Sequence, residues 1–78
     1  MSITRKEILA NQKKLGKRVK QLRLERDMSQ MDLSVHCDLE KSNLSKIENG
    51  RANLTLRTMS MLAKALDVEL EELFDFRV

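Results

Sequence analysis

The chain has 78 residues with no proline, two glycines and one cysteine, a size that suits one small domain. β-Branched and aromatic residues are sparse whereas Leu, Lys, Glu and Met are abundant, which favours an all-α fold. One cysteine cannot form an internal disulfide, and no apolar run is long enough to span a membrane. These features exclude disulfide-stapled and membrane-spanning classes of protein and predict a cytoplasmic one.

The formal net charge is +3, but the two ends of the chain differ in sign. Residues 1–26 contain nine Lys or Arg against two Glu, whereas residues 58–78 contain two Lys or Arg against five Asp or Glu. A basic N-terminal half attracts polyanions such as nucleic acid, although a run of charge is also typical of a solvated helix face. Charge alone leaves both interpretations open.

A long first helix is predicted over residues 5–26. Thr4 and Glu7 form a capping-box pattern at its start. Apolar side chains then recur at helical spacing, at Ile8, Leu15, Val19 and Leu22. Gly16 weakens this helix by about 1 kcal/mol relative to alanine, so we expect fraying before it. Asp27 follows the helix, where left-handed backbone is common.

Two short helices joined by a tight turn are predicted within residues 29–49. A second capping pattern begins at Ser29 and starts a helix over 30–37, and the next helix covers 41–48. Their inward residues are Leu33, Cys37, Leu44 and Ile47. The outer face of 41–48 is polar and cationic without a carboxylate, because Glu48 falls on the inner side.

Gly50 ends the third helix, and Thr55 caps a fourth over residues 56–66. A short last helix is predicted over 69–74. The chain is therefore expected to be one five-helix domain, residues 1–78. Apolar residues close to the C-terminus either cap its own core or form a self-complementary dimer patch, which we favour. The patch would contain Leu70, Leu73, Phe74, Phe76 and Val78.

An enzyme would need a base, a nucleophile or a metal site, and the residue types for one are scarce. His36 and Cys37 are adjacent but cannot complete a zinc site without further ligands. Cys37 is expected in the core and His36 at an exposed helix end. We therefore expect no catalytic residue, no metal, no cofactor and no small-molecule effector.

The dispersed pattern over residues 15–74 resembles the Cro/repressor-type helix-turn-helix domain of bacteria and phages, the XRE family. The residues that carry the resemblance are Arg23, Ser29, Gln30, Leu33, Ser34, Leu39 and the run from Leu44 to Gly50, followed by Leu66, Asp67, Val68, Leu73 and Phe74. The resemblance implies an all-α, five-helix bundle of the lambda-repressor-like type. Its helix-turn-helix would be formed by the second and third helices.

The same resemblance implies a site for double-stranded DNA, with the helix over 41–48 in the major groove. Base edges would be read by Lys41, Ser42, Asn43 and Lys46. Phosphates would be contacted by Lys17, Arg18, Ser29, Gln30, Asn49, Arg51 and Asn53. Arg23 and Glu48 match positions that form a partly buried ion pair in several relatives.

Two departures from the family pattern are Asp27 and Asp38, where glycine is usual. Aspartate tolerates positive φ at some strain, and Asp38 near the groove would repel phosphate. The loop over residues 50–56 is similar to that of small restriction–modification controller proteins, and also to loops of other small regulators.

The predicted function is a homodimeric, sequence-specific transcriptional regulator that binds a roughly palindromic operator. One alternative is an antitoxin that represses its own operon and binds a toxin through the domain surface. Another is a protein-interaction module that has lost DNA binding. Contact with RNA polymerase is a further possible partnership. A co-purifying stoichiometric partner would favour the antitoxin, and failure to retain DNA at low salt would favour the interaction module.

Overall fold

The computed structural model describes residues 2–77, which form four α-helices and one 3-10 helix. In chain order these are α1 (Arg5–Glu25), α2 (Gln30–Cys37), α3 (Lys41–Glu48), α4 (Leu56–Ala65) and η1 (Leu70–Phe74). The all-α prediction is confirmed, and the four α-helices lie within one residue of their predicted bounds. The prediction of five α-helices is wrong, because the last element is a five-residue 3-10 helix, the form that short helical pieces often adopt.

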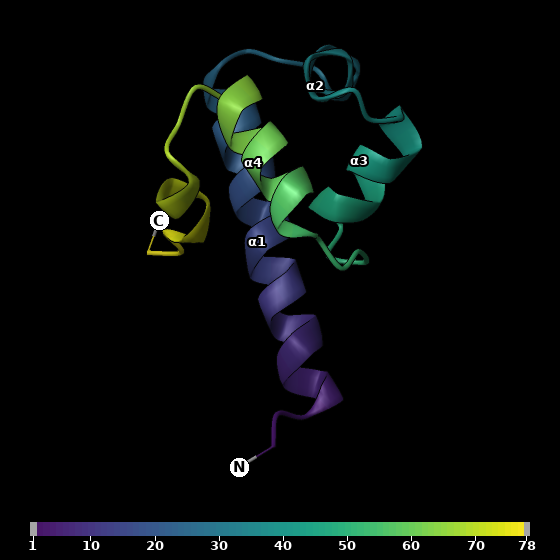
Figure 1. The fold of residues 1–78 in the computed structure, drawn as a ribbon, viewed down its shortest axis with the longest axis vertical. Coiled ribbons are helices and arrows are strands. Elements are labelled where there is room, and N and C mark those ends of the chain that lie inside the picture. The colour runs from purple at the N-terminus through teal and green to yellow at the C-terminus, as the bar shows by residue number, and fades with distance from the viewer. Residues whose placement is uncertain (1, 78) are drawn as a thin grey trace.

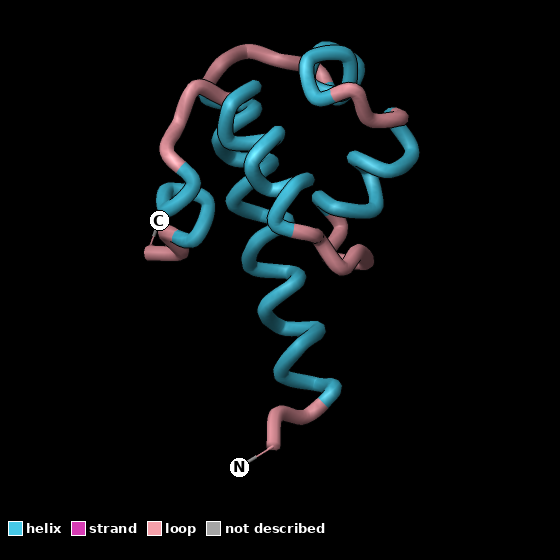
Figure 2. The backbone as a smooth tube through the Cα atoms, viewed as in Figure 1, coloured by secondary structure: helices cyan, strands magenta, loops and turns pink. Residues whose placement is uncertain are grey.

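The C-terminal part of α1 is the centre of the fold (Figure 1). α3, α4 and η1 gather around it, and α2 and α3 lie at one end and side of the molecule. Figure 2 shows the same arrangement along the backbone and the N-terminal turns of α1 extending beyond it. This layout leaves the outer side of α3 free of other elements.

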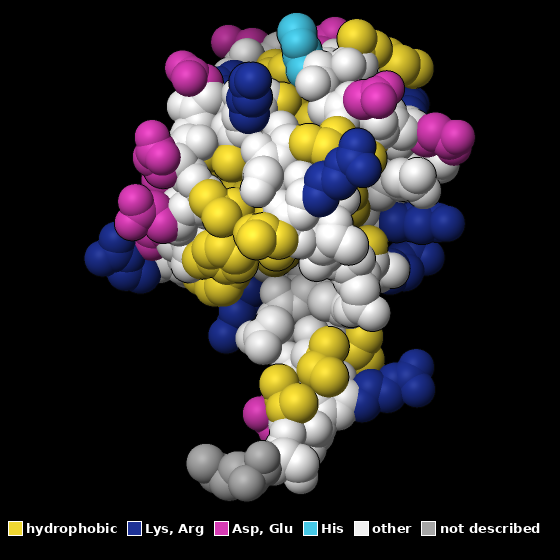
Figure 3. All heavy atoms as spheres, in the orientation of Figure 1, with side chains coloured by type: hydrophobic (Ala, Val, Ile, Leu, Met, Phe, Trp, Pro, Cys, Tyr) yellow, Lys and Arg dark blue, Asp and Glu magenta, His cyan; other side chains and the backbone are white. Residues whose placement is uncertain are grey.

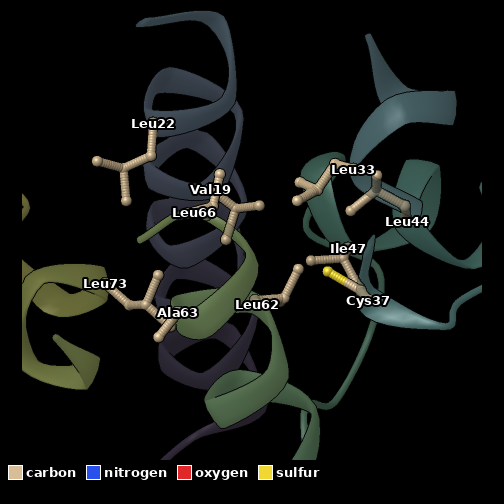
Figure 4. Close-up of a cluster of buried hydrophobic side chains, with 10 residues drawn as sticks. All are labelled: Val19, Leu22, Leu33, Cys37, Leu44, Ile47, Leu62, Ala63, Leu66 and Leu73. Carbon is tan, nitrogen blue, oxygen red and sulfur yellow. The ribbon is translucent and has the colours of Figure 1, made fainter. Parts of the chain in front are cut away.

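The core is built from aliphatic side chains of every helix and one thiol. It contains Val19, Leu22, Leu33, Cys37, Leu44, Ile47, Leu62, Ala63, Leu66 and Leu73 (Figure 4). Helical spacing predicts the core residues of the first three helices, whereas Leu73 is expected in a dimer patch. Because Leu73 is completely buried in the described chain, it anchors η1 to α4 and α1 and cannot also lie at an interface.

The ends of three helices are closed by an aspartate in left-handed backbone. Asp27, Asp38 and Asp67 have φ of 55°, 55° and 58°, as expected for the first two and missed for the third. In each case the next residue donates its N–H back across the helix end, from Met28 to Arg23 O, from Leu39 to Ser34 O and from Val68 to Ala63 O, at 2.9–3.2 Å. Those three apolar residues also pack against the core, which completes a Schellman-type ending.

Gly50 closes α3 in the same way, with φ of 72° and a bond from the Arg51 N–H to Lys46 O at 2.9 Å. Aspartate would not fit here, because a Cβ at Gly50 would lie 2.7 Å from the Cα of Lys13. The end of α3 is thus packed directly on the backbone of α1.

Gly16 makes the second close approach between these two helices. A Cβ at this position would lie 2.8 Å from the carbonyl oxygen of Glu48, and closer still to that of Ile47. The expected fraying before Gly16 is not found, since α1 is continuous from Arg5 to Glu25. The helical cost of the glycine is offset by the close contact that it permits, and this contact sets where α3 lies.

Candidate nucleic-acid interface

The outer face of α3 is polar, cationic and exposed. Leu44 and Ile47 turn into the core, so the opposite side of α3 points outward. The four residues expected to read bases, Lys41, Ser42, Asn43 and Lys46, are all exposed. The fold therefore brings them together on one accessible surface, which is short enough to fit a major groove.

Glu48, the only carboxylate of α3, is withdrawn from that face. Arg23 donates from Nε to Glu48 Oε2 at 2.7 Å and from Nη2 to Oε1 at 2.9 Å. The two side chains are 8% and 2% exposed, so the ion pair expected from the resemblance is present and buried. The hydrogen bond with Glu48 raises the pKa of Arg23, and the guanidinium also donates to Met28 O at 2.8 Å. The pair thus joins α1, α3 and the chain entering α2.

Gln30 shares the same carboxylate. Its Nε2 donates to Glu48 Oε1 at 3.0 Å from a half-buried position at the start of α2. An amide nitrogen carries a second hydrogen, and the amide oxygen is a further acceptor. Gln30 is therefore fixed by α3 on its inner side while one donor remains for another partner. The expectation for Gln30 concerns phosphate alone, and no residue pattern indicates the contact with Glu48.

Ser29 is exposed and caps α2. Its Oγ accepts from the N–H of Asp32 at 3.0 Å, and its own N–H donates to Asp32 Oδ2 at 2.9 Å. The hydrogen bond from the Ser29 N–H is the main cause that lowers the pKa of the Asp32 carboxyl, and the Ser29 hydroxyl lowers it further. The cap fixes the N-terminus of α2, where free backbone N–H groups favour an anion such as phosphate.

The loop after α3 carries the next expected contacts. Asn49 and Arg51 are exposed, and Asn49 Nδ2 donates weakly to Ser45 Oγ at 3.4 Å. Asn53 is tied to α1, because its Oδ1 accepts from Gln12 Nε2. The exposed Lys13 belongs beside this loop, since its backbone lies against Gly50. Sequence reasoning missed Lys13 because only the tight contact at Gly50 places it there.

Lys17 and Arg18 do not join the α3 face. Arg18 donates from Nε to the carbonyl oxygen of Glu72 at 2.8 Å and from Nη1 to Gln21 Oε1 at 3.1 Å. Both residues line a hollow beside Asp75 of the C-terminal segment. The phosphate contact expected of Arg18 stays a prediction, and the structure adds that its guanidinium ties α1 to η1. The exposed Lys17 lies on the same side.

The expected dimer patch is partly exposed. Phe74 and Phe76 are 47% and 40% exposed and pack edge to face, with ring centroids 6.4 Å apart. Leu70 is half-buried, Leu73 is buried as described above, and Val78 lies outside the described residues. The patch that remains accessible is therefore centred on the two phenylalanines.

Residues 2–77 contain no group of three His, Cys, Asp or Glu placed to hold a metal ion. His36 is exposed, whereas burial raises the pKa of the Cys37 thiol to about 11. A thiol with a raised pKa is a poor nucleophile. Within the described residues no helix has the length and apolar character needed to cross a membrane.

These features define a class of protein. Residues 19–73 match the model of a helix-turn-helix family, and the chain belongs to this family, as the resemblance to Cro/repressor-type domains predicted.

Particular relatives are restriction–modification controller proteins. The control protein C.BamHI of Bacillus amyloliquefaciens is 40% identical over 62 residues, which cover 78% of this chain and 76% of that protein. The crystal structure of the controller C.AhdI from Aeromonas hydrophila superposes with a TM-score of 0.82 at 37% identity, covering 83% of this chain and 98% of that one. The controller C.Esp1396I, solved as a tetramer with its natural 35 base-pair operator, matches with a TM-score of 0.75 at 31% identity, over 82% of this chain and 84% of that one.

Proposed function

We propose that this chain is a sequence-specific, double-stranded DNA-binding transcriptional regulator and not an enzyme. The observation that carries the proposal is the outer face of α3. Three exposed residues of that face, Lys41, Ser42 and Lys46, can donate to base edges, and Glu48, the one carboxylate within α3, is buried against Arg23 and Gln30. A cationic helix face free of carboxylates suits the negative potential of the major groove.

In this proposal α2 and α3 are the helix-turn-helix, with α3 as the recognition helix. Lys41 and Lys46 would donate to guanine O6 or N7, with Ser42 and Asn43 beside them, so each half-site would contain at least one guanine. The phosphates on either side would be held by the remaining donors of the site. These are Ser29, Gln30, Asn49, Arg51 and Asn53, to which we add Lys13.

We further propose that one domain, residues 1–78, acts as a homodimer on a roughly palindromic operator. Two-fold pairing would present two recognition helices about 34 Å apart, one turn of B-DNA. The exposed pair Phe74 and Phe76, with Leu70 beside it, is the apolar surface that would be covered. The oligomeric state of C.Esp1396I on its operator supports an assembly of this kind.

The regulatory setting that the relatives favour is control of a restriction–modification system. The matches to C.BamHI and C.AhdI extend over most of both chains. By contrast, the immunity repressor of Bacillus phage phi105 is matched over only 39% of its length. Methyltransferase and endonuclease genes next to the gene for this chain would support the controller role, and a toxin gene there would favour the antitoxin.

The decisive experiment is selection of bound sequences from a random DNA pool, followed by the same selection with variants. Lys46→Ala and Ser42→Ala should change the preferred bases, because they alter base contacts. Arg51→Ala should weaken binding to all sequences alike and lower the slope of log affinity against log salt by about 1. If the base preference survives both α3 substitutions, α3 is not the recognition helix.

A further inference from the structure

The first six residues of α1, 5–10, form an arm that projects from the body of the molecule (Figure 1). The arm begins at a complete capping box, in which Thr4 Oγ1 accepts from the Glu7 N–H at 3.1 Å and the Thr4 N–H donates to Glu7 Oε1 at 3.3 Å. It lies before residue 19, where the family match begins. Membership of the family therefore does not account for it.

The arm leaves apolar side chains in solvent. Ile8 and Leu9 are 39% and 43% exposed, and Ile3, just before the arm, is 58% exposed. An end of a helix that buries little is expected to fray, because most helical stability in proteins comes from packing an apolar face. A capped and apolar arm therefore indicates that a further surface covers it.

An open apolar groove starts at the base of this arm. It is lined by Ile8 and Leu15 of α1, Leu54 of the loop before α4, Met59 of α4, and Phe74 and Phe76 of the C-terminal segment. Figure 3 shows apolar side chains gathered over η1 and the adjoining part of α4, and again on the projecting end of α1. The groove is continuous with the two phenylalanines to which we assign dimerisation.

Charge favours a second copy of this chain as the occupant. Residues 5–10 contain two Lys or Arg against one Glu, whereas residues 67–77 contain five Asp or Glu against one Arg. The ion pairs among residues 2–77 are Arg23–Glu48, Arg26–Glu25 and Arg77–Asp75, so none joins the arm to the C-terminal segment. In an isologous pair, the basic arm of each copy would meet the acidic segment of the other, so the same contact would form twice in the dimer.

We infer that the arm of each copy packs along the apolar groove of the other, so that Ile8 lies at the interface between two copies. This inference rests on the proposed homodimer, and adds that α1 carries part of its contact. The surface for the arm and the patch of Phe74 and Phe76 then form one continuous interface.

The test compares two substitutions on opposite sides of the arm. Ile8→Asp places a carboxylate on the groove side, and Ala10→Asp places the same carboxylate two residues on, about 160° around the helix, at an exposed position. The dimer dissociation constant is measured by sedimentation equilibrium, and helicity by circular dichroism. Ile8→Asp should raise the dissociation constant by about tenfold or more, whereas Ala10→Asp should change it less than about twofold.

The variant Phe76→Asp distinguishes a failure of the arm inference from a failure of the proposed homodimer. If Ile8→Asp dimerises like the parent while Phe76→Asp is monomeric, the arm inference is overturned and the homodimer stands. If the parent protein is monomeric at every concentration and on operator DNA, the proposed homodimer fails first. Should Ile8→Asp lose helicity, Ile8→Gln gives the same comparison with a better helix former, and a dissociation constant equal to that of the parent overturns the inference.

Discussion

The buried cluster of Arg23, Glu48 and Gln30 leads to the most specific prediction. In Glu48→Ala the guanidinium of Arg23, whose side chain is 8% exposed, keeps only the Met28 carbonyl as a partner. Gln30 also loses its acceptor. Removing one member of a buried pair costs about 3–5 kcal/mol, because the other charge stays buried without compensation. A chain of 78 residues has a total stability of roughly 4–12 kcal/mol, so this variant should be close to unfolding.

The assay is urea denaturation followed by circular dichroism, with the midpoint and slope measured separately. The matched variant is the double substitution Arg23→Met with Glu48→Met, which removes both charges together. Replacing a buried pair by apolar residues is often neutral or stabilising, so the double variant should recover most of the loss. The exposed pair Arg77–Asp75 is the control, and Asp75→Ala should leave the midpoint unchanged.

The prediction also separates stability from DNA binding. The double variant should fold but bind all DNA sequences more weakly, because Gln30 is no longer held for a phosphate. A loss below about 1 kcal/mol in Glu48→Ala would refute the reasoning, since that value belongs to a solvated surface pair.

Three further outcomes follow from the structure. Asp38→Gly and Asp67→Gly should each stabilise the fold by up to about 1 kcal/mol in urea denaturation. Left-handed backbone costs a non-glycine residue about 1–2 kcal/mol, and the greater unfolded-state entropy of glycine offsets about 0.4–1 kcal/mol of that gain. Only Asp38→Gly should also tighten DNA binding, and equal binding gains for both variants would contradict the place of Asp38 beside α3. Burial raises the pKa of the Cys37 thiol to about 11, so this thiol should resist alkylation at pH 8 unless urea is added. The stability that this pKa difference contributes is complete below pH 9 and is lost as the pH rises through about 11. The Ser29 N–H is the main cause that lowers the pKa of Asp32 from 3.8, so the ionised carboxylate should stabilise the fold above pH 3.8. This stabilisation should be lost as the pH falls through the lower pKa of the folded state, and it should be absent in Asp32→Ala.

Much of the fold can be predicted from the sequence, because its signals are local. Thr4, Ser29 and Thr55 start helices through hydrogen bonds within one turn, and their side-chain bonds are all present. The inward and outward faces of α3 follow from helical spacing alone. The exposed face of the candidate site was therefore predictable.

Other features depend on how the helices meet, and here prediction failed. The hydrogen bond from Arg18 to the Glu72 carbonyl has no signal in the sequence, because it forms only where η1 returns to α1. Leu73 was assigned to an interface, but the same return buries it. A five-residue segment has too few residues for spacing to distinguish its own core from a partner, so only the tertiary arrangement decides.

The close contact at Gly16 bears on the geometry of the operator. Alanine there would meet the carbonyl oxygens of Ile47 and Glu48, so α3 would have to move outward, although residue 16 is buried and is not part of the exposed face of α3. In a two-fold dimer each copy would undergo this displacement, so the separation of the two recognition helices would change by the sum of the two displacements. The half-sites of B-DNA are fixed at about 34 Å or its multiples, so the DNA would have to bend or twist to follow. In the proposed dimer, the absence of a side chain at Gly16 would therefore help to set the spacing of the two half-sites that the recognition helices reach.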